Sequence, residues 1–410
     1  MKPMGPIPSW ATGEEEMLLI GGCGAESLVD EAGDTPLFVY DMDIVAAQVR
    51  RFREAMPAAL HLHYAVKANP YAPLLARMAH QVDGFDIASG GELEMALESG
   101  MAPDRISFAG PGKRNDELSA AIFAGVTINL ESEGEARRAL AVAEAIGKTP
   151  RLAVRVNPDF DLKGSGMRMG GGAKPFGVDA DRAGALARMV IDAGASWQGW
   201  HIFAGSQNLD AAAIIETQAA TIALAARLSD EVGATPPLVN LGGGFGIPYF
   251  PGDVPLDIRS IGMALDTALE ERPDILRGSD FAIELGRWLV GEAGVYLTRV
   301  IDVKVSQGET FVVVDGGLHH QLAASGNFGT VVRRNYPIAV ANRFGSQPIA
   351  DPVTVVGCLC TPIDRLGDKV ALPSVEEGDL IAIFQAGAYG ASASPAAFLG
   401  HPAPREVLLG

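Results

Sequence analysis

Short β-rich runs alternate with helical stretches through the first two thirds of the chain. We identify eight runs, at 61–67, 84–88, 105–109, 126–131, 151–157, 199–205, 237–242 and 280–285. Stretches rich in Ala, Leu and Glu separate them, for example 91–98 and 133–145. Because strand–helix alternation is typical of a parallel sheet, two folds are open at this point. One is a closed (β/α)8 barrel, and the other is an open, doubly wound sheet.

The position of polar residues favours the barrel. At or just past the C-terminal ends of the runs lie Lys67, Asp86, Ser89, Glu131, Arg155, Asn157, Ser206, the glycines 242–244, Glu284 and Arg287. A barrel gathers all of these at one mouth, where the active sites of barrel enzymes form, whereas an open sheet spreads them along an edge. We therefore predict a (β/α)8 TIM barrel.

After about residue 290 the pattern changes. The segments 295–305, 310–315, 352–358 and 380–384 read as strands bounded by Gly, Pro and Asp, and helical periodicity almost disappears. This predicts an antiparallel β domain, which the N-terminal segment is expected to join through Leu37–Tyr40. The expected division is an N-terminal segment 1–40, a barrel 41–290 and a β domain 291–410.

Composition excludes several classes of protein. The formal net charge of −18 argues against binding nucleic acid or an anionic membrane. No apolar stretch is judged long enough to span a bilayer and no signal pattern opens the chain, so a cytoplasmic location is expected. The three cysteines, Cys23, Cys358 and Cys360, are no disulfide framework. Because Cys358-Leu359-Cys360 has no second ligand cluster, no metal site is predicted.

The segment 63–70, His-Tyr-Ala-Val-Lys-Ala-Asn-Pro, places Lys67 at the end of the first barrel strand. A lysine in apolar surroundings loses proton affinity and becomes a usable nucleophile. The electrophile that fits it best is the aldehyde of pyridoxal 5′-phosphate (PLP). The alternative is a lysine that only extends its amine from a buried strand to solvent.

Four other motifs carry candidate chemistry. The glycine-rich segment 242–246, Gly-Gly-Gly-Phe-Gly, suits a phosphate or merely a tight loop. Glu284 suits a pyridine nitrogen and Arg287 a phosphate, unless the two form a local ion pair. Cys360 with Asp364 offers a cysteine and a carboxylate that can face the barrel mouth, unless they are a small buried cysteine and a solvated ion pair. The Tyr389 hydroxyl, within 387–390, can donate to a phosphate, unless the ring only packs at a strand end. We assign no catalytic role to His201, His319 or His320, because a histidine beside a strand is more often a core residue with its hydrogen bonds satisfied.

Together these motifs resemble the fold-type III PLP-dependent decarboxylases, the ornithine/diaminopimelate/arginine decarboxylase family. The motifs that carry the resemblance are YAVKAN at 64–69, DIASGGE at 86–92, GSQ at 205–207, GGGFG at 242–246, ELGR at 284–287, Cys360 with Asp364, and GAYG at 387–390. The resemblance implies a barrel plus an alanine-racemase-like β domain. It also implies a homodimer with active sites shared at the interface, and decarboxylation of a small-molecule amino-acid substrate.

The resemblance also implies a role for individual residues. Lys67 forms the Schiff base with PLP, Asp86 lies near it, and Glu284 pairs with the pyridinium nitrogen. The phosphate is held by Ser206, Gly243, Gly244, Arg287 and Tyr389. Cys360, donated by the partner subunit, acts on the carbanionic intermediate, with Asp364 close by.

Departures from the family pattern bear on the substrate. Phe203 stands where a histidine usually stacks on the PLP ring, and Thr361 stands where an acidic residue binds the distal ammonium of diamines and diaminopimelate. The surrounding sequence is similar to the exosortase A system-associated branch, whose partner acyl carriers suggest a tethered amino acid. We therefore expect decarboxylation of an L-amino acid or of a carrier-bound derivative. Three alternatives stay open: a diaminopimelate- or ornithine-type decarboxylase, a catalytically silent PLP- or partner-binding homologue, and an isomerase or racemase.

Overall fold

The computed structural model describes residues 1–160, 163–164, 167–168, 171–326 and 334–410, and these form two units. The barrel unit comprises Gln48–Gly246 and Pro255–Gly286, and the β unit comprises Met1–Ala47, Ile247–Val254 and Arg287–Gly410. The chain therefore enters the barrel unit within helix α2 (Met42–Ala55) and leaves it at Gly286. The segment Ile247–Val254, which the strand pattern does not single out, belongs to the β unit.

Eight parallel strands close the barrel. They are β5 (Leu60–Ala65), β6 (Gly84–Ile87), β7 (Ile106–Phe108), β8 (Thr127–Leu130), β9 (Arg151–Asn157), β12 (Ser196–Ile202), β14 (Leu238–Asn240) and β15 (Asp280–Leu285). Each pairs with the next in this order, and β15 pairs back with β5. The prediction of a (β/α)8 barrel is confirmed, and a doubly wound sheet is excluded because the sheet has no open end.

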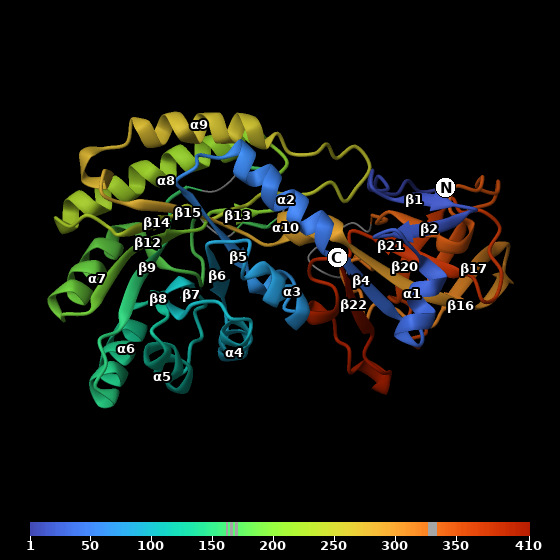
Figure 1. Cartoon of the computed structure of the whole chain (residues 1–410), viewed down its shortest axis with the longest axis horizontal. Helices are drawn as coiled ribbons and strands as arrows, with labels where there is room; N and C mark the ends of the chain where they lie inside the picture. Colours follow the sequence, from blue (N-terminus) through green and yellow to red (C-terminus); the bar gives the residue numbers. More distant parts are fainter. Residues whose placement is uncertain (161–162, 165–166, 169–170, 327–333) are drawn as a thin grey trace. The chain divides into compact units, whose positions relative to one another are not determined.

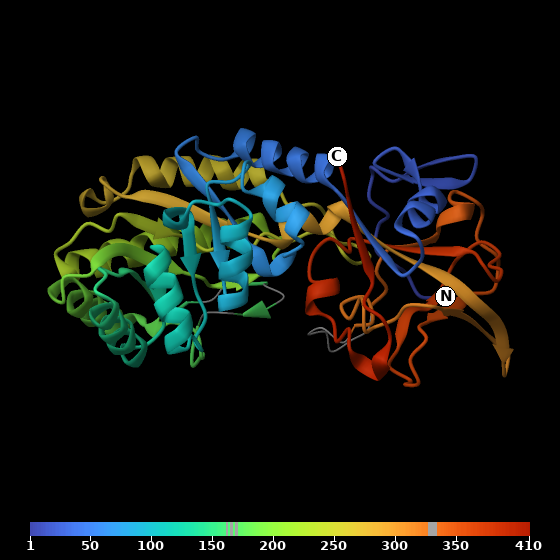
Figure 2. The same ribbon diagram turned by 60° about the horizontal axis from the view of Figure 1, so that its bottom comes forward.

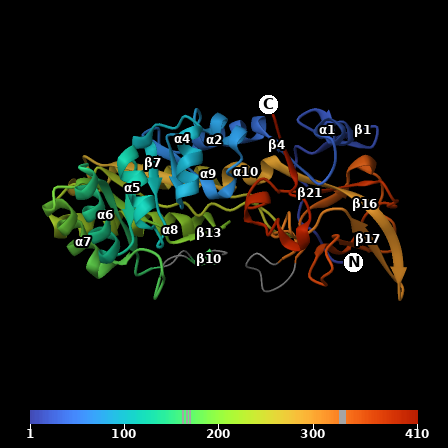
Figure 3. The same cartoon turned by 90° about the horizontal axis from the view of Figure 1, so that it is seen from below.

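Helices cover the outside of the barrel (Figure 1; other sides in Figures 2 and 3). They are α3 (Ala72–Met78), α4 (Gly90–Glu98), α5 (Asn115–Ala124), α6 (Glu133–Ile146), α7 (Ala180–Asp192), α8 (Ala211–Val232) and α9 (Ile258–Glu270). Local sequence sets several of their ends. Ser132 accepts a hydrogen bond from the Glu135 N–H at the start of α6, and Asp210 caps α8 in the same way. Gly147 and Gly233, at φ of 65° and 72°, end these helices in the left-handed conformation.

Helix α8 corrects one expectation from the sequence. Its 22 residues are long and apolar enough to cross a membrane by length and composition alone, although no such stretch was expected. Half of its apolar window is buried, and it packs against α7 and α9 as one of the outer helices of the barrel. Its apolar character is therefore explained by barrel packing, which supports a soluble protein.

The β unit holds a mixed sheet. Its strands are β4 (Leu37–Asp41), β16 (Gly294–Ser306), β17 (Glu309–Val314), β18 (Ile338–Val340), β19 (Val353–Val356), β20 (Arg365–Val370), β21 (Leu380–Phe384) and β22 (Arg405–Leu409). The long strand β16 pairs antiparallel with β17, β21 and β4, and β16 and β17 run side by side in Figure 3. Two pairings, β17–β19 and β22–β4, are parallel, so the expected antiparallel domain is more precisely a mixed one.

Alternate residues of the central strands build the core of the β unit. Leu37 and Val39 of β4, and Leu297 of β16, are fully buried on one face of the sheet. Helix α1 (Ala25–Ala32) and strand β2 (Met17–Ile20) pack onto that face, while β1 (Thr12–Glu14) and β3 (Cys23–Gly24) flank β2. The N-terminal segment is therefore integral to this sheet rather than an appendage.

Candidate active site

Lys67 follows β5 directly, within a single 3-10 turn at Val66–Ala68. Its neighbours Val66 and Ala68 are buried, but the Lys67 side chain itself is exposed. Its Nζ atom lies 5.9 Å from the centroid of the Phe203 ring. The predicted position of Lys67 just past the end of a barrel strand is confirmed. The expected apolar surroundings of its amine are wrong, because the side chain is exposed.

Two imidazole–carboxylate pairs lie inside the barrel. His63 Nδ1 is 3.4 Å from Asp86 Oδ2, and His201 Nε2 is 3.0 Å from Glu284 Oε2. All four residues are buried. The parallel register explains both pairs. His63 lies opposite Gly84, two residues before Asp86 on the neighbouring strand. His201 lies opposite Asn240, which lies opposite Ala282, two residues before Glu284. No role is predicted for His63 or His201 from the sequence, because only the strand register shows which carboxylate each imidazole contacts.

The two pairs differ in their effect on protonation. Burial raises the pKa of the Glu284 carboxyl, but His201, and more weakly Lys67 and Arg155, outweigh this and hold the pKa well below its usual range. For His63, burial lowers the pKa, and the Asp86 carboxylate more than offsets this, so the pKa lies above its ordinary value. Glu284, which also accepts a hydrogen bond from Asn240 Nδ2 at 3.3 Å, is therefore a fixed negative charge in the barrel.

The glycine loop after β14 is built for close approach to another group. A Cβ on Gly243 would lie 1.9 Å from the Glu284 carbonyl oxygen, so no side chain fits there. Gly244 has a φ of +92°, which side chains rarely allow. Within the described part of the chain, the Ser206 hydroxyl of β13 (Gly205–Ser206) is buried and has no hydrogen-bond partner. A buried hydroxyl in that state calls for a polar guest, and an anion such as phosphate fits it.

Arg287, which opens α10 (Arg287–Val290) in the β unit, is held by two tyrosines. Its Nη1 donates to the Tyr249 hydroxyl at 3.1 Å, and its guanidinium carbon lies 4.6 Å from the centroid of the Tyr389 ring. Burial lowers the pKa of Arg287, but the nearby tyrosines outweigh this, so the guanidinium stays charged. Tyr249 was missed from the sequence, because it lies on the short segment that joins the β unit from within the barrel sequence.

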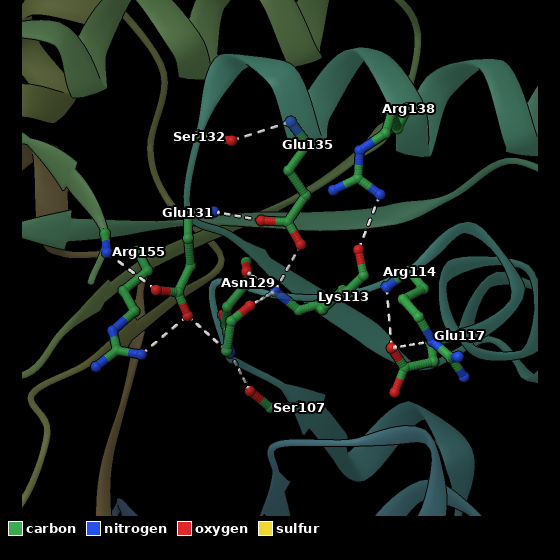
Figure 4. Close-up of polar contacts among 12 residues, drawn as sticks. Ser107, Lys113, Arg114, Glu117, Asn129, Glu131, Ser132, Glu135, Arg138 and Arg155 are labelled. Atoms are coloured by element: carbon green, nitrogen blue, oxygen red, sulfur yellow. Dashed lines mark hydrogen bonds and ion pairs between the residues drawn. The ribbon is translucent and has the colours of Figure 1, made fainter. Parts of the chain in front are cut away.

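A buried ionic network joins Glu131, which directly follows β8, to Arg155 on β9 (Figure 4). Glu131 accepts a hydrogen bond from Arg155 Nη1 at 2.9 Å and others from the backbone N–H groups of Gly110 and Gly177. Lys113 donates to Glu135 Oε1 at 2.7 Å. Glu131 and Arg155, noted in the sequence as polar strand-end residues, are therefore paired with each other and hold loops of the mouth in place.

The loop that carries Cys360 lies in the β unit between β19 and β20. Cys360 is exposed and Thr361 is half-buried. Asp364 is buried, and its carboxylate accepts hydrogen bonds from the Leu318 N–H at 2.7 Å and the Leu359 N–H at 2.9 Å. This geometry makes Asp364 an organiser of the loop, and its expected catalytic and substrate-binding roles stay a prediction.

Comparison with known proteins agrees with these features. Residues 42–291 match the family model described as pyridoxal-dependent decarboxylase, pyridoxal binding domain. The chain is 39% identical to an L-glutamyl-[BtrI acyl-carrier protein] decarboxylase of Niallia circulans, over 92% of this chain and 89% of that protein. It is 33% identical to a diaminopimelate decarboxylase of Methanothermobacter thermautotrophicus, over 98% and 93%.

Solved structures give the same result. A diaminopimelate decarboxylase from M. jannaschii in co-complex with L-lysine superposes with a TM-score of 0.88 at 27% identity, covering 98% of this chain and 93% of that one. The enzyme from Helicobacter pylori complexed with L-lysine gives 0.84 at 28% identity, covering 94% of each. The family, cofactor and fold expected from the sequence are thereby confirmed. The chain belongs to the pyridoxal-dependent decarboxylase family of fold type III, and it is a PLP-dependent carboxy-lyase acting on an amino acid.

Proposed function

We propose that this decarboxylase acts on an L-amino acid joined to an acyl carrier protein, with a glutamyl group as the first candidate. The observation that carries the proposal is the 39% identity, over 92% of the chain, to a relative named for that substrate. The diaminopimelate decarboxylase of M. thermautotrophicus matches a similar span at 33%. Because the reaction removes the α-carboxylate, a carrier-bound glutamate must be attached through its side-chain carboxyl.

Thr361 supports a substrate without a distal ammonium. A buried ammonium that lacks a carboxylate partner costs several kcal/mol, and the family's acidic residue at this position is replaced here by a neutral hydroxyl. Asp364 is a poor substitute, because its two oxygens already accept hydrogen bonds from Leu318 and Leu359. Lysine, ornithine and diaminopimelate are therefore disfavoured.

The barrel residues fit PLP. When bound, PLP supplies a ring that takes up the electron pair left by the departing carboxylate. Lys67, exposed at the mouth, is the amine that would hold the cofactor through its aldehyde. Glu284 is held ionised by His201 and would keep a proton on the pyridine nitrogen. Asp86, whose oxygens are buried and have no hydrogen-bond partner by strict geometry within the described residues, is oriented by the His63 imidazole.

For the phosphate, we propose the donors that the family resemblance implies, each described by itself. Ser206 and the backbone of Gly243 and Gly244 offer N–H and O–H donors without steric hindrance. Arg287 offers a charged fork that Tyr249 fixes in place. Tyr389 is proposed as a further donor. Phe203 offers an aromatic face in place of the family's stacking histidine, which removes one titratable group from that side of the ring.

Two further parts of the proposal concern assembly and location. Cys360 is proposed to act in the active site of a partner subunit, protonating the carbon that has lost CO2, so that the working form is a homodimer with shared sites. The exposure of Cys360 is compatible with that role. A cytoplasmic location is proposed because PLP and acyl carrier proteins would both be met there.

A second candidate is an ordinary diaminopimelate decarboxylase, favoured by the relatives and solved structures that bear that name. A catalytically silent homologue is disfavoured because Lys67 and Cys360 are both retained. An isomerase would need a second acid or base on the opposite face of the cofactor, and the sequence offers no tyrosine clearly placed for it.

The test compares CO2 release from glutamyl-loaded acyl carrier protein, free glutamate, ornithine, lysine and meso-diaminopimelate. The proposal expects turnover of the carrier-bound substrate at least a hundredfold above every free amino acid. Efficient turnover of diaminopimelate, with no gain on introducing Thr361→Glu, would replace it with the second candidate. Absence of CO2 from every substrate, by protein that binds PLP, would favour the silent homologue.

A further inference from the structure

The β unit contains a cluster of one thiol and two imidazoles that the decarboxylase chemistry does not use. Cys358, His319 and His401 each offer one ligand atom, and these atoms all lie within 4.8 Å of one another. The Cys358 sulfur is 3.8 Å from His401 Nδ1 and 3.9 Å from its Nε2. The rings of His319 and His401 have centroids 5.2 Å apart. Three distant segments of the chain thus meet at one point.

The state of His319 indicates that the cluster binds a further ligand. Its side chain is 0% exposed, and neither ring nitrogen has a hydrogen-bond partner among the residues that the structure describes. A buried polar group without a partner costs about 1–3 kcal/mol. The neighbouring His320 is different, because its Nε2 faces the Pro402 carbonyl at 2.9 Å and its Nδ1 faces the Tyr296 hydroxyl at 3.0 Å. The carbonyl only accepts, so His320 carries its proton on Nε2 and is satisfied as a neutral ring.

The backbone around the three side chains is held in place next to each of them. One carboxylate, that of Asp364, accepts from the N–H of Leu318, which precedes His319, and from the N–H of Leu359, which follows Cys358. The hydrogen bond from His320 to Pro402 joins the residue after His319 to the residue after His401. Such contacts beside the ligands are what orient a metal site before the metal arrives.

We propose that His319, Cys358 and His401 form a binding site for Zn2+ or a similar borderline-soft divalent ion. Two imidazole nitrogens and one thiolate are a donor set that Zn2+ prefers. Tetrahedral zinc, with bonds of about 2.0–2.1 Å to nitrogen and about 2.3 Å to sulfur, brings sulfur and nitrogen to roughly 3.6 Å from each other. The present separations require side-chain movements of only about 1 Å to reach that geometry. The fourth position is left for water or another ligand.

Binding replaces the Cys358 S–H bond by a sulfur–metal bond, and the thiol proton leaves to solvent. A thiolate–imidazolium nucleophile is the competing interpretation of a cysteine beside a histidine. That pair needs only one imidazole, whereas here a second imidazole, that of the buried His319, lies at the same point. The metal site would also fix the loop that carries Cys360, because Cys358 lies two residues before it. The site itself does not depend on which amino acid the enzyme decarboxylates.

The test uses PLP-loaded protein that has been dialysed against a chelator and is then titrated with Co2+, which reports thiolate ligation and four-coordination in its absorption spectrum. We expect one Co2+ per chain, a thiolate-to-metal charge-transfer band, and displacement of both by Zn2+. Cys358→Ser should abolish the charge-transfer band, and His401→Asn should weaken Co2+ binding at least tenfold. The matched controls are the exposed Cys23→Ser and His80→Asn, which should bind Co2+ as the wild type does.

Folding of each variant is checked by its PLP absorption and its unfolding temperature, and His401→Asn, at a half-buried position, guards against a Cys358 variant that does not fold. The proposal is overturned if the charge-transfer band survives in Cys358→Ser or disappears in Cys23→Ser. It is also overturned if wild-type protein takes up no Co2+, or if Cys360→Ser rather than Cys358→Ser removes the band. In that last case the exposed catalytic thiol, not the cluster, binds the ion.

Discussion

Removing the Lys113 ammonium should destabilise the barrel strongly. The side chain is 1% exposed, and its three N–H groups donate to Glu135 Oε1 at 2.7 Å, the Gly110 carbonyl at 2.7 Å and the Asn129 carbonyl at 2.9 Å (Figure 4). Lys113→Met keeps most of the apolar stem but leaves the buried Glu135 carboxylate without its counter-charge. Breaking a buried pair in this way costs about 3–5 kcal/mol.

That free energy converts into a shift of the unfolding temperature. The barrel unit spans Gln48–Gly246 and Pro255–Gly286, roughly 230 residues with an unfolding entropy of about 2.1 cal/mol/K each. The expected shift is therefore about 6–10 °C downwards. Helical circular dichroism is the suitable signal, because the long helices α4–α9 belong to this unit. It follows the barrel even when the two units do not unfold together.

Two further variants separate the lost charge from lost packing. Adding Glu135→Gln to Lys113→Met neutralises the unpaired carboxylate while keeping an oxygen for the Glu131 N–H, and should recover at least half of the loss. The control is Arg114→Met, whose side chain is 73% exposed and paired with the exposed Asp116, and it should change stability by less than about 0.5 kcal/mol. A shift below about 2 °C for Lys113→Met, or no recovery with Glu135→Gln, would refute the reasoning.

Four other outcomes are expected. Borohydride should fix the cofactor to Lys67, and Lys67→Ala should lose the covalent adduct; a peptide map with the adduct on another lysine contradicts the assignment. Arg287→Ala should weaken PLP binding about tenfold to a hundredfold, which corresponds to the loss of one charge-assisted hydrogen bond. Tyr249→Phe should weaken PLP binding less. If the wild type and both variants bind PLP with equal affinity, Arg287 has a structural role and does not bind the phosphate. Mixing inactive Lys67→Ala and Cys360→Ala subunits should restore part of the activity if sites are shared, and no recovery after proven subunit exchange argues against sharing. Burial raises the pKa of the Glu131 carboxyl, but Arg155 and Lys113 outweigh burial and hold the pKa in the folded protein below the ordinary value of 4.5. The ionised Glu131 therefore stabilises the fold above pH 4.5, and this stabilisation is lost as the pH falls through the pKa of the folded state. The difference in unfolding temperature between the wild type and Glu131→Gln should therefore become smaller in acid.

Sequence patterns located the barrel well because its strands are buried on both faces and bounded by turn residues. All eight predicted runs overlap strands of the structure, but their ends differ. The run 61–67 extends past β5, which ends at Ala65, because Val66–Ala68 form a 3-10 turn. The run 199–205 begins three residues late, because the half-buried Ser196 and Gln198 are polar and leave Trp197 as the one apolar residue before Gly199. Strand ends depend on hydrogen bonding, which composition does not report.

The β unit was harder to predict. Strand β20, Arg-Leu-Gly-Asp-Lys-Val, mixes charges and glycine, and no alternation marks it as a strand. The charge of its buried Asp368 is accommodated by Lys2 and Arg365, and Lys2 lies far away in the sequence. The parallel pairings of β19 and β22 join segments far apart in the chain, and their partners are decided by tertiary packing. Local sequence patterns therefore predict where strands lie in the chain, but the order in which strands pair in a mixed sheet is known only from the three-dimensional structure.

The same dependence on tertiary structure explains which residues of the site could be predicted from the sequence. Residues that follow strand ends, such as Lys67 and Glu284, were found because a barrel sends all its strand ends to one mouth. Their neighbours were not, since His201 meets Glu284 only through the register of three strands. The metal cluster is the extreme case. A ligand search along the sequence rejected Cys358 because no other ligands lie at zinc-finger spacing, yet His401, 43 residues away, lies within 4 Å of its sulfur in the folded chain. Spacing rules describe sites built on one turn or hairpin, and a site assembled from three loops of a mixed sheet leaves no such trace. The decisive evidence is that His319 is buried and has no hydrogen-bond partner among the residues that the structure describes.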